Sequence, residues 1–239
     1  MTCWFQALMV LAWFRKHENM RLLAAGFKIA QATAYRYRDE VITVLQAQRP
    51  DLYEALHRVA EEGWTYVIID GKLFHTDRCA ETTTSVKGKT INAWYSGKHR
   101  DFGGNAQSIT RPDGFPVWLS EVAPGHDHDL AVARDQQIIT ALVWAATALK
   151  LPALADSGYE GAGQGIHTPI KTPPGGHGLA PDNETYNLLQ RGLRALGERG
   201  FALLTQRWTA LQHTTASPRK IGDIAAAALV LTHFEHGYL

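Results

Sequence analysis

The sequence predicts an α/β protein in which a mixed sheet is flanked by helices and preceded by an all-helical region. Two short apolar runs, at 66–69 and 151–155, each end in an aspartate and predict buried strands. The chain between them holds two more predicted strands and a long amphipathic helix, whereas the first 60 residues show helical patterns only. We therefore expect a helical region over residues 1–60 and a sheet-containing domain over residues 61–239.

Composition narrows the class of protein. The chain has 239 residues, 45% of them hydrophobic, and a net charge of +1, so any nucleic-acid contact must come from a local patch. Two cysteines form neither a disulfide framework nor a metal-binding spacing, which fits a reducing cytoplasm. The apolar segment 4–14 lacks a preceding basic residue and is too short to span a bilayer, so we expect a buried helix and no membrane association.

The N-terminal region has the order of a helix-turn-helix motif. A helix over 4–14 and a short helical stretch broken by Gly26 precede a longer helix over 29–45. The first fifty residues carry seven Lys and Arg against three Asp and Glu, which places positive charge here. We expect DNA contacts from the start of the longer helix, at Thr33, Tyr35, Arg36 and Arg38. An ordinary helical bundle explains these residues equally well.

The first predicted strand, 65–70, follows a connecting helix over 51–63 and ends in Asp70-Gly71. Taken alone, that pair indicates a turn rather than a site, and residues 74–76 form either the second arm of a hairpin or an extension of the strand. Further along, residues 81–91 form an exposed loop and residues 94–100 a basic and aromatic tract. Two strands follow at 105–110 and 117–122, joined by a turn at 111–114.

The tract His126-Asp127-His128-Asp129 precedes a helix predicted over 130–149. Its His and Asp content suggests a metal site, but Asp129 occupies an N-cap position and exposed histidines are the simpler interpretation. The strand at 151–155 then ends in Asp156-Ser157-Gly158, which repeats the arrangement at Asp70. Because side chains at the carboxyl ends of neighbouring parallel strands converge, we expect Asp70 and Asp156 to lie side by side.

The C-terminal third is mostly helical. An edge strand at 167–171 and a Pro- and Gly-rich loop at 172–182 lead into a helical pattern over 183–211. Its apolar face is marked by Tyr186, Leu189, Leu193, Leu196, Phe201 and Leu204. Arg191, Arg194 and Glu198 are spaced three and four apart, so they line one stripe, either functional or a solvated salt-bridge face. A last helix covers 219–235.

The ordered motifs resemble a known family, the DDE transposases of bacterial insertion sequences in the group related to Harbinger elements. The motifs that carry the resemblance are Ile69-Asp70-Gly71, Tyr95-Ser96-Gly97-Lys98-His99 with Asn105 and Gln107, Pro124-Gly125, His128-Asp129-Leu130, Ala155-Asp156-Ser157-Gly158-Tyr159 with Gly161, Arg194, Gly197-Glu198 and Arg207-Trp208. The resemblance implies a ribonuclease H-like catalytic domain. It also implies a bacterial, cytoplasmic and nucleoid-associated transposase that acts on the terminal inverted repeats of its element.

The resemblance also implies roles for individual residues. Asp70, Asp156 and Glu198 would be the catalytic acids and metal ligands, and three carboxylates suit hard cations such as Mg²⁺, with Mn²⁺ as an alternative. Two such ions about 3.5–4 Å apart can activate water or a 3′-hydroxyl at a phosphodiester. His128 and Asp129 would be auxiliary. Double-stranded DNA would be bound by a homo-oligomer, with contacts from Lys98, His99, Arg191, Arg194 and Arg207.

Departures from the family pattern leave other functions open. Thr205 stands seven residues after Glu198, where the family often carries a lysine, and the N-terminus is short for the family. One alternative is a non-catalytic DNA-binding protein, that is, a decayed or recruited transposase copy. Another is a hydrolase of small phosphorylated substrates that uses His126, His128 and Asp129, but the predicted strands argue against it because such enzymes are usually all-helical.

Overall fold

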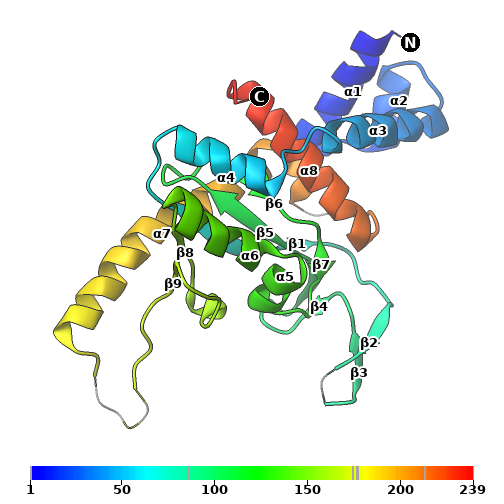
Figure 1. The fold of residues 1–239 in the computed structure, drawn as a ribbon. Helices are drawn as coiled ribbons and strands as arrows, with labels where there is room; N and C mark the ends of the chain where they lie inside the picture. The colour runs from blue at the N-terminus through cyan, green and yellow to red at the C-terminus, as the bar shows by residue number, and fades with distance from the viewer. Residues whose placement is uncertain (1, 86, 174, 176–177, 213, 239) are drawn as a thin grey trace.

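The structure, a computed structural model, describes residues 2–238 except 86, 174, 176, 177 and 213. Within these residues a mixed sheet of seven strands carries helices on both faces, and the N-terminal helices lie at one end of the molecule (Figure 1). A second, two-stranded sheet projects from the body. The α/β class and the N-terminal helical region are therefore confirmed.

The strands pair in the order β4-β5-β1-β8-β9, and β6 and β7 pair with β5 as well. β5 runs antiparallel to both β1 and β6, whereas β8 and β9 run parallel to β1. The strands are β1 (Val67–His75), β4 (Tyr95–Ser96), β5 (Asp101–Thr110), β6 (Pro116–Leu119), β7 (Ala123–Pro124), β8 (Ala153–Leu154) and β9 (Ile166–His167), with β2 (Thr82–Thr84) and β3 (Thr90–Asn92) in the small sheet.

The central strand β1 passes through Asp70-Gly71 without turning. Its buried start, Val67 to Ile69, has the β-branched side chains expected of an interior strand, and its second half pairs with β5 as far as His75. The turn at Asp70-Gly71 and the hairpin alternative are therefore wrong, and the strand extension is right. The register sets Asp70 opposite Ser108 and Gly71 opposite Gln107 on β5.

One face of the sheet is covered by α4 (Leu52–Glu61) and α6 (Ile138–Trp144). Leu56 and Val59 of α4 pack with Val67 and Ile69 of β1 and with Leu142 of α6 in one buried cluster. Asp51 begins α4 with a capping box, in which its side chain accepts from the backbone and Glu54 reaches back to the Asp51 N–H. The predicted connecting helix is thus part of the sheet's core.

The helix predicted over 130–149 is broken. It forms α5 (Asp129–Asp135), α6 and a π-helical turn η1 (Ala145–Leu149), and Gln137 between α5 and α6 has a left-handed φ of 59°. The apolar periodicity continues through the break because Val132 and Ile138 are both buried. Only the change of direction at Gln137 distinguishes two helices from one.

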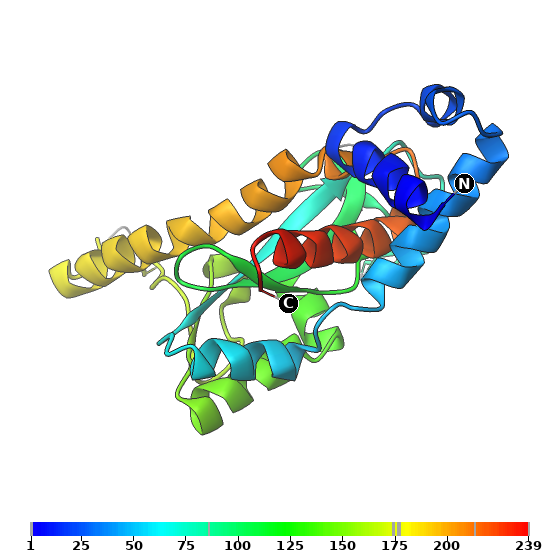
Figure 2. The ribbon, with the colours of Figure 1, turned by 90° about the horizontal axis from the view of Figure 1, so that it is seen from above.

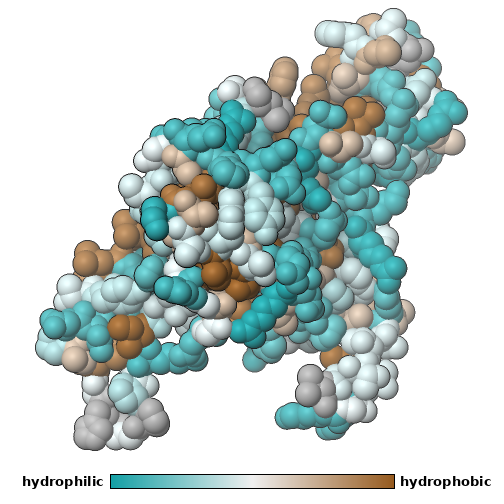
Figure 3. All heavy atoms as spheres, viewed as in Figure 1, coloured by the Kyte–Doolittle hydropathy of each residue, from teal (hydrophilic) through white to brown (hydrophobic). Residues whose placement is uncertain are grey.

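The other face of the sheet is covered by α7 (Pro181–Arg207), which extends well beyond the body (Figures 1 and 2). Pro181 at its start and acidic residues in its first turn suit a helix N-terminus. Its buried side matches only the C-terminal part of the predicted apolar face: Phe201 and Leu204 are buried, whereas Leu189, Leu193 and Leu196 are exposed, and apolar side chains lie on the surface over α7 (Figure 3). The buried residues are Gln190, Gly197, Gly200, Phe201 and Leu204.

Close contacts seat α7 on the sheet. A Cβ atom added at Gly197 would lie 2.7 Å from Cγ2 of Ile68 on β1, and one at Gly200 would lie 2.5 Å from Cγ2 of Thr110 on β5. The β5–β6 turn supports the same part of the helix, since a Cβ at Gly114 would lie 2.4 Å from the Leu196 carbonyl oxygen. Gly114 also has a φ of 82°, so this turn requires glycine twice over.

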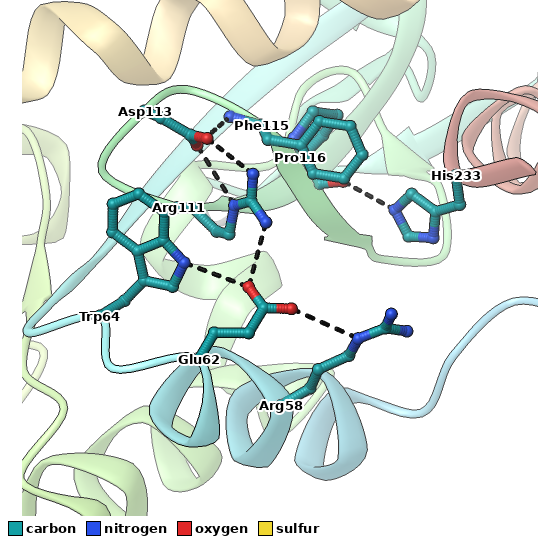
Figure 4. Close-up of polar contacts among 8 residues, drawn as sticks. All are labelled: Arg58, Glu62, Trp64, Arg111, Asp113, Phe115, Pro116 and His233. Carbon is teal, nitrogen blue, oxygen red and sulfur yellow. Dashed lines mark hydrogen bonds and ion pairs between the residues drawn. The ribbon is translucent and has the colours of Figure 1, made fainter. Parts of the chain in front are cut away.

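A polar cluster ties that turn to α4. The Arg111 guanidinium donates to Glu62 at 3.0 Å and to Asp113 at 2.6 Å, and the Trp64 indole donates to the same Glu62 oxygen at 3.1 Å (Figure 4). Arg58 pairs with the other Glu62 oxygen at 3.4 Å. The turn that supports α7 is therefore fixed to the opposite face of the sheet.

The N-terminal helices are α1 (Cys3–Lys16), α2 (Met20–Gly26) and α3 (Gln31–Gln46). The short helix, turn and longer helix expected from the sequence are α2 and α3. Their core is shared with α8 (Pro218–Glu235) and with the turn η3 (Thr209–Leu211), since Phe14, Ala34 and Leu229 belong to one buried cluster. The predicted boundary at residue 60 stays a prediction, but the apolar residues of α1–α3 have no core separate from α8.

Two other expectations need correction. The exposed loop predicted at 81–91 contains the hairpin of β2 and β3, and the edge strand predicted at 167–171 shrinks to Ile166 and His167. The helix predicted over 219–235 is confirmed as α8. No helix in the described part of the chain is long and apolar enough to cross a membrane.

Candidate active site

Asp70 and Asp156 lie at the same level of the sheet. β8 is parallel to β1, with Val67 opposite Ala153 and Ile68 opposite Leu154. Two residues further along each chain come Asp70 and Asp156, both half-buried. The Asp156 carboxylate also accepts from the Gly158 N–H at 2.8 Å, which begins the short helix η2 (Ser157–Tyr159). The convergence expected from the two strand ends therefore exists.

The charges around Asp70 are unbalanced. The pKa of Asp70 is raised to about 6, mainly by burial, and the nearby carboxylates of Asp156 and Asp129 act in the same direction, against the lowering effect of Arg194. Three acids and one arginine thus share this region. Such a group is one that a bound cation would stabilise, because it would relieve both the repulsion and the cost of burial.

Arg194 and Glu198 come from α7, which is unbroken across them, so the predicted stripe exists. Arg194 is half-buried and its Nε is buried without a hydrogen-bond partner among the described residues. Glu198, one turn later, is exposed, as is Arg191. The structure therefore brings Arg194 to the two aspartates, whereas Glu198, four residues later, is exposed beside the contact of Gly197 with β1.

An open cleft of about 640 Å³ lies beside the aspartates. Its lining includes Asp156, the predicted DNA-binding residues Lys98 and His99, and the tract from His126 to Asp129. Burial and the adjacent Lys98 lower the pKa of His99. Lys98 is 67% exposed at its side chain and reaches Asp129 at 3.4 Å. Cations and carboxylates thus face one another across a space that is large enough for a segment of a polymer.

His128 and Asp129 begin α5, with His128 at the N-cap position and Asp129 in the first turn. The expected N-cap at Asp129 is therefore displaced by one residue. The Asp129 carboxylate lies over Gly71, since a Cβ there would be 2.4 Å from Asp129 Oδ1 and 2.9 Å from Gln107 Nε2. A side chain at position 71 would displace both groups, so Gly71 has a packing role as well as its place in the motif.

The amides that hold Asp129 were not predicted as site residues. The Asn105 side-chain N–H donates to Asp129 Oδ1 at 2.8 Å, and Gln107 donates to Asn105 Oδ1 at 3.1 Å. The Tyr159 hydroxyl in turn donates to Gln107 Oε1. Two amides two residues apart on a predicted strand share one face, and this was the sequence signal that the prediction did not use.

The predicted DNA-binding residues of α3 differ in their surroundings. Tyr35 and Arg36 are exposed, and Thr33 is half-buried. Arg38 instead pairs with Asp39 at 2.7 Å and lies over the Trp13 ring at 5.3 Å, so it is engaged within the helical region. On α7, Arg207 is paired with Glu235 of α8. Among these residues, Tyr35 and Arg36 present the most accessible surface to a ligand.

The residues present suit a divalent cation in part. Asp70 and Asp156 offer carboxylate oxygens, which hard cations prefer, at two aligned strand ends. Across the described residues, no three His, Cys, Asp or Glu side chains stand close enough together to form a ready metal site. Asp70 and Asp156 are thus the two carboxylates here that could hold a cation, and the third predicted ligand, Glu198, is exposed.

Comparisons with known proteins give two matches. The model of a family described as "DDE superfamily endonuclease" matches residues 69–233, which is more than half of the chain. The model of a family described as "Helix-turn-helix of DDE superfamily endonuclease" matches residues 5–51, which cover α1 to α3. No curated protein and no solved structure matches the chain.

Proposed function

The chain belongs to the DDE superfamily endonucleases, and we propose that it is a transposase of a bacterial insertion sequence in the Harbinger-related group. Its sheet domain would be ribonuclease H-like. It would cut DNA at the terminal inverted repeats of its element and join the cut end to target DNA. The family and the helix-turn-helix match support cleavage of DNA by a DNA-binding protein.

The alignment of Asp70 within β1 with Asp156 just after β8 is the observation that carries this proposal. Two carboxylates at one level can share a cation. The pKa of Asp70, raised to about 6, shows that its negative charge is disfavoured by burial and by the neighbouring carboxylates, and a bound cation would offset both effects. Divalent cations in such a site lower the pKa of bound water and stabilise a leaving oxygen. Asp70 and Asp156 would hold Mg²⁺ or Mn²⁺, and Glu198 would complete the site.

The basic side chains near the site, and the exposed side chains of α3, have distinct tasks in this proposal. Arg194, half-buried beside the aspartates, would balance their charge and contact the phosphate. Lys98 and His99 would hold the DNA backbone in the cleft, because ammonium and imidazole N–H groups donate to phosphate oxygens. Tyr35 and Arg36 on α3 would bind double-stranded DNA at a distance from the cleft.

We further propose a homo-oligomer on DNA in the bacterial cytoplasm, since each element has two ends to be cut. Exposed Leu189, Leu193 and Leu196 on α7 are available for such contacts. Arg191 would support binding from the same helix, and Arg207 would do so only if it left Glu235.

The test is cleavage of a plasmid that carries the DNA flanking the gene, with and without Mg²⁺. We expect nicking by the wild type in Mg²⁺, and at least a hundredfold slower nicking by Asp70→Asn, Asp156→Asn and Glu198→Gln. Binding of the same DNA, measured by fluorescence anisotropy, should persist in all three variants. The matched control is Glu184→Gln, an exposed glutamate near the start of the same helix as Glu198.

The outcomes separate the candidate functions. Wild-type protein that binds this DNA but never nicks it would favour a non-catalytic DNA-binding protein. A Glu198→Gln variant that cuts at the wild-type rate would remove Glu198 from the acid set, whereas loss of activity in Glu184→Gln would show that charge changes on α7 act indirectly.

A further inference from the structure

A directed chain of hydrogen bonds crosses the sheet beside the aspartates. Tyr159 in η2 donates to Gln107 on β5, Gln107 donates to Asn105, and Asn105 donates to Asp129 at the start of α5. Tyr159 and Gln107 are fully buried and Asn105 is 7% exposed. The chain therefore links the loop that carries Asp156 with the floor of the cleft.

The direction of the chain is fixed by its chemistry. Burial, reinforced by the nearby carboxylates, raises the pKa of Tyr159, so its hydroxyl remains a donor. Gln107 must then present its oxygen to Tyr159 and its N–H group to Asn105. Asn105 in turn directs its N–H group at Asp129 Oδ1 and at the Asp127 carbonyl, at 2.8 and 3.2 Å. Each bond in such a chain strengthens the next.

The chain of hydrogen bonds ends at the Lys98 ammonium group. Asp129 Oδ1 is occupied by Asn105, and Oδ2 faces the Lys98 ammonium at 3.4 Å. Asp129 is only 16% exposed at its side chain, whereas Lys98 is 67% exposed. A fixed carboxylate thus holds one end of a long, mobile side chain, and the two remaining ammonium N–H donors of Lys98 stay free to bind another acceptor.

We propose that Asp129 is a positioning residue that holds the Lys98 ammonium in the cleft for a DNA phosphate, and that Tyr159, Gln107 and Asn105 position Asp129. This inference rests on the proposed DNA-cleaving function. One oxygen of Asp129 accepts from Asn105 and the other faces the Lys98 ammonium, so the carboxylate is placed to orient Lys98. An ammonium held in advance loses less conformational freedom when the phosphate arrives.

The key variant is Asp129→Asn, which keeps the side-chain shape but removes the charge. We expect cleavage under single-turnover conditions to slow by about tenfold to a hundredfold, because Lys98 loses its anchor. DNA affinity should stay equal or increase, because one negative charge leaves the cleft. A merely structural role would lower rate and affinity together, so this split is diagnostic. The control is Asp135→Asn, the same charge change at the exposed far end of α5.

A double variant tests the link to Lys98. Lys98→Ala should slow the wild-type enzyme by a similar factor, but it should add nothing to Asp129→Asn if the carboxylate acts through the ammonium. Tyr159→Phe, which removes only the hydroxyl, should reproduce a part of the rate loss. A wild-type rate in Asp129→Asn, or effects of Lys98→Ala and Asp129→Asn that multiply, would overturn the proposal.

A readout independent of cleavage separates this inference from the proposed function. In solution NMR, the Lys98 ammonium should give a resolved ¹H–¹⁵N signal that Asp129→Asn abolishes and Asp135→Asn preserves, and this signal should shift when a short DNA duplex is added. Wild-type protein that cuts no DNA would contradict the proposed function, yet the signal would still decide the positioning role. A Lys98 signal unchanged in Asp129→Asn would overturn the inference even in an active enzyme.

Discussion

His233 is the side chain most sensitive to pH outside the cleft. It is fully buried in α8, its Nε2 donates to the Pro116 carbonyl at 2.8 Å, and its ring stacks on Phe115 (Figure 4). Burial lowers its pKa to about 4, and the nearby Arg58 and Arg111 lower it as well, against the effect of the Pro116 hydrogen bond. Its Nδ1 is buried with no hydrogen-bond partner in the described part of the chain, so a proton there would create an unpaired charge.

Stability should therefore fall in mild acid. Because the folded protein holds His233 neutral, its contribution is complete above the unfolded pKa of 6.5 and is lost as the pH falls towards 4. We expect His233 alone to reduce the free energy of unfolding by about 2–3 kcal/mol between pH 7 and pH 4.5. Urea denaturation at the two pH values measures this loss.

The comparison variant is His233→Gln, whose amide can still donate to Pro116 but cannot titrate. Between pH 7 and pH 4.5, this variant should lose about 2–3 kcal/mol less of its free energy of unfolding than the wild type does. His167→Gln, at an exposed position in β9, should leave the wild-type pH dependence unchanged. Equal pH dependence in His233→Gln and the wild type would contradict the assignment.

At the same scale, the sequence predicted that Asp70 and Asp156 lie at one level because each follows a short apolar run, which is a local pattern, although β1 continues past Asp70 to His75. It did not predict the positioning of Asp129, because that depends on Asn105 of a distant strand and on the absence of a side chain at Gly71. Arg38 was predicted as a DNA contact, yet it packs against Trp13. Charge can be read from sequence, but the partner of a charge depends on the fold.

At the scale of elements, α7 contacts the sheet closely at Gly197 and leaves open space at Gly192. Gly197 lies against Ile68, where a Cβ would approach to 2.7 Å, whereas a Cβ at Gly192 would meet nothing within 4 Å. Both glycines weaken an isolated helix equally, because glycine has more conformational freedom to lose on folding. Of the two, only Gly197 offsets this loss of helix stability, because it allows α7 to approach the sheet closely.

The two positions should respond in opposite directions to alanine. Gly192→Ala should raise the free energy of unfolding by about 0.5–1 kcal/mol, because the helix gains propensity at an open position. Gly197→Ala should lower it by about 1–3 kcal/mol, because the new methyl group pushes α7 away from β1. Chemical denaturation measures both, and a stabilised Gly197→Ala would show that α7 is not seated on the sheet at this point.

Cleavage provides a second readout for the same pair. Since Arg194 and Glu198 flank Gly197, the Gly197→Ala variant should also lose nuclease activity, while Gly192→Ala should retain it. The helical pattern alone could not distinguish these glycines, although only Gly197 belongs to a motif of the family resemblance. The sequence also could not place the break at Gln137, where burial on both sides hides the change of direction.

At the scale of the whole molecule, the N-terminal helices and α8 share one core although they lie at opposite ends of the sequence. Phe14 of α1 is fully buried and its ring meets Trp208 at 6.1 Å, and the Trp208 indole donates to Thr232 of α8 at 2.8 Å. The division into two sequence regions therefore does not correspond to two separate cores. Sequence periodicity predicts that a helix has an apolar face, but not which other helix covers that face.

This shared core predicts cooperative unfolding. Phe14→Ala should lower the free energy of unfolding by about 3–5 kcal/mol, and calorimetry should show one transition that moves as a whole. Phe234→Ala, at an exposed position on α8, should have little effect. Two transitions, with only the smaller one moved by Phe14→Ala, would indicate that the helical region folds by itself.

The hydrogen bonds of α7 fix the helix at a second place besides Gly197. Gln190 donates to the Ala155 carbonyl at 3.1 Å and to the His167 carbonyl at 2.7 Å, and the Asn187 side chain bonds both backbone groups of Ile170. Gln190 and Gly197 are seven residues, or roughly 10 Å, apart on the helix axis. Because Gln190 holds the backbone just before Asp156, a displacement of α7 would move Arg194 and the Asp156 loop together.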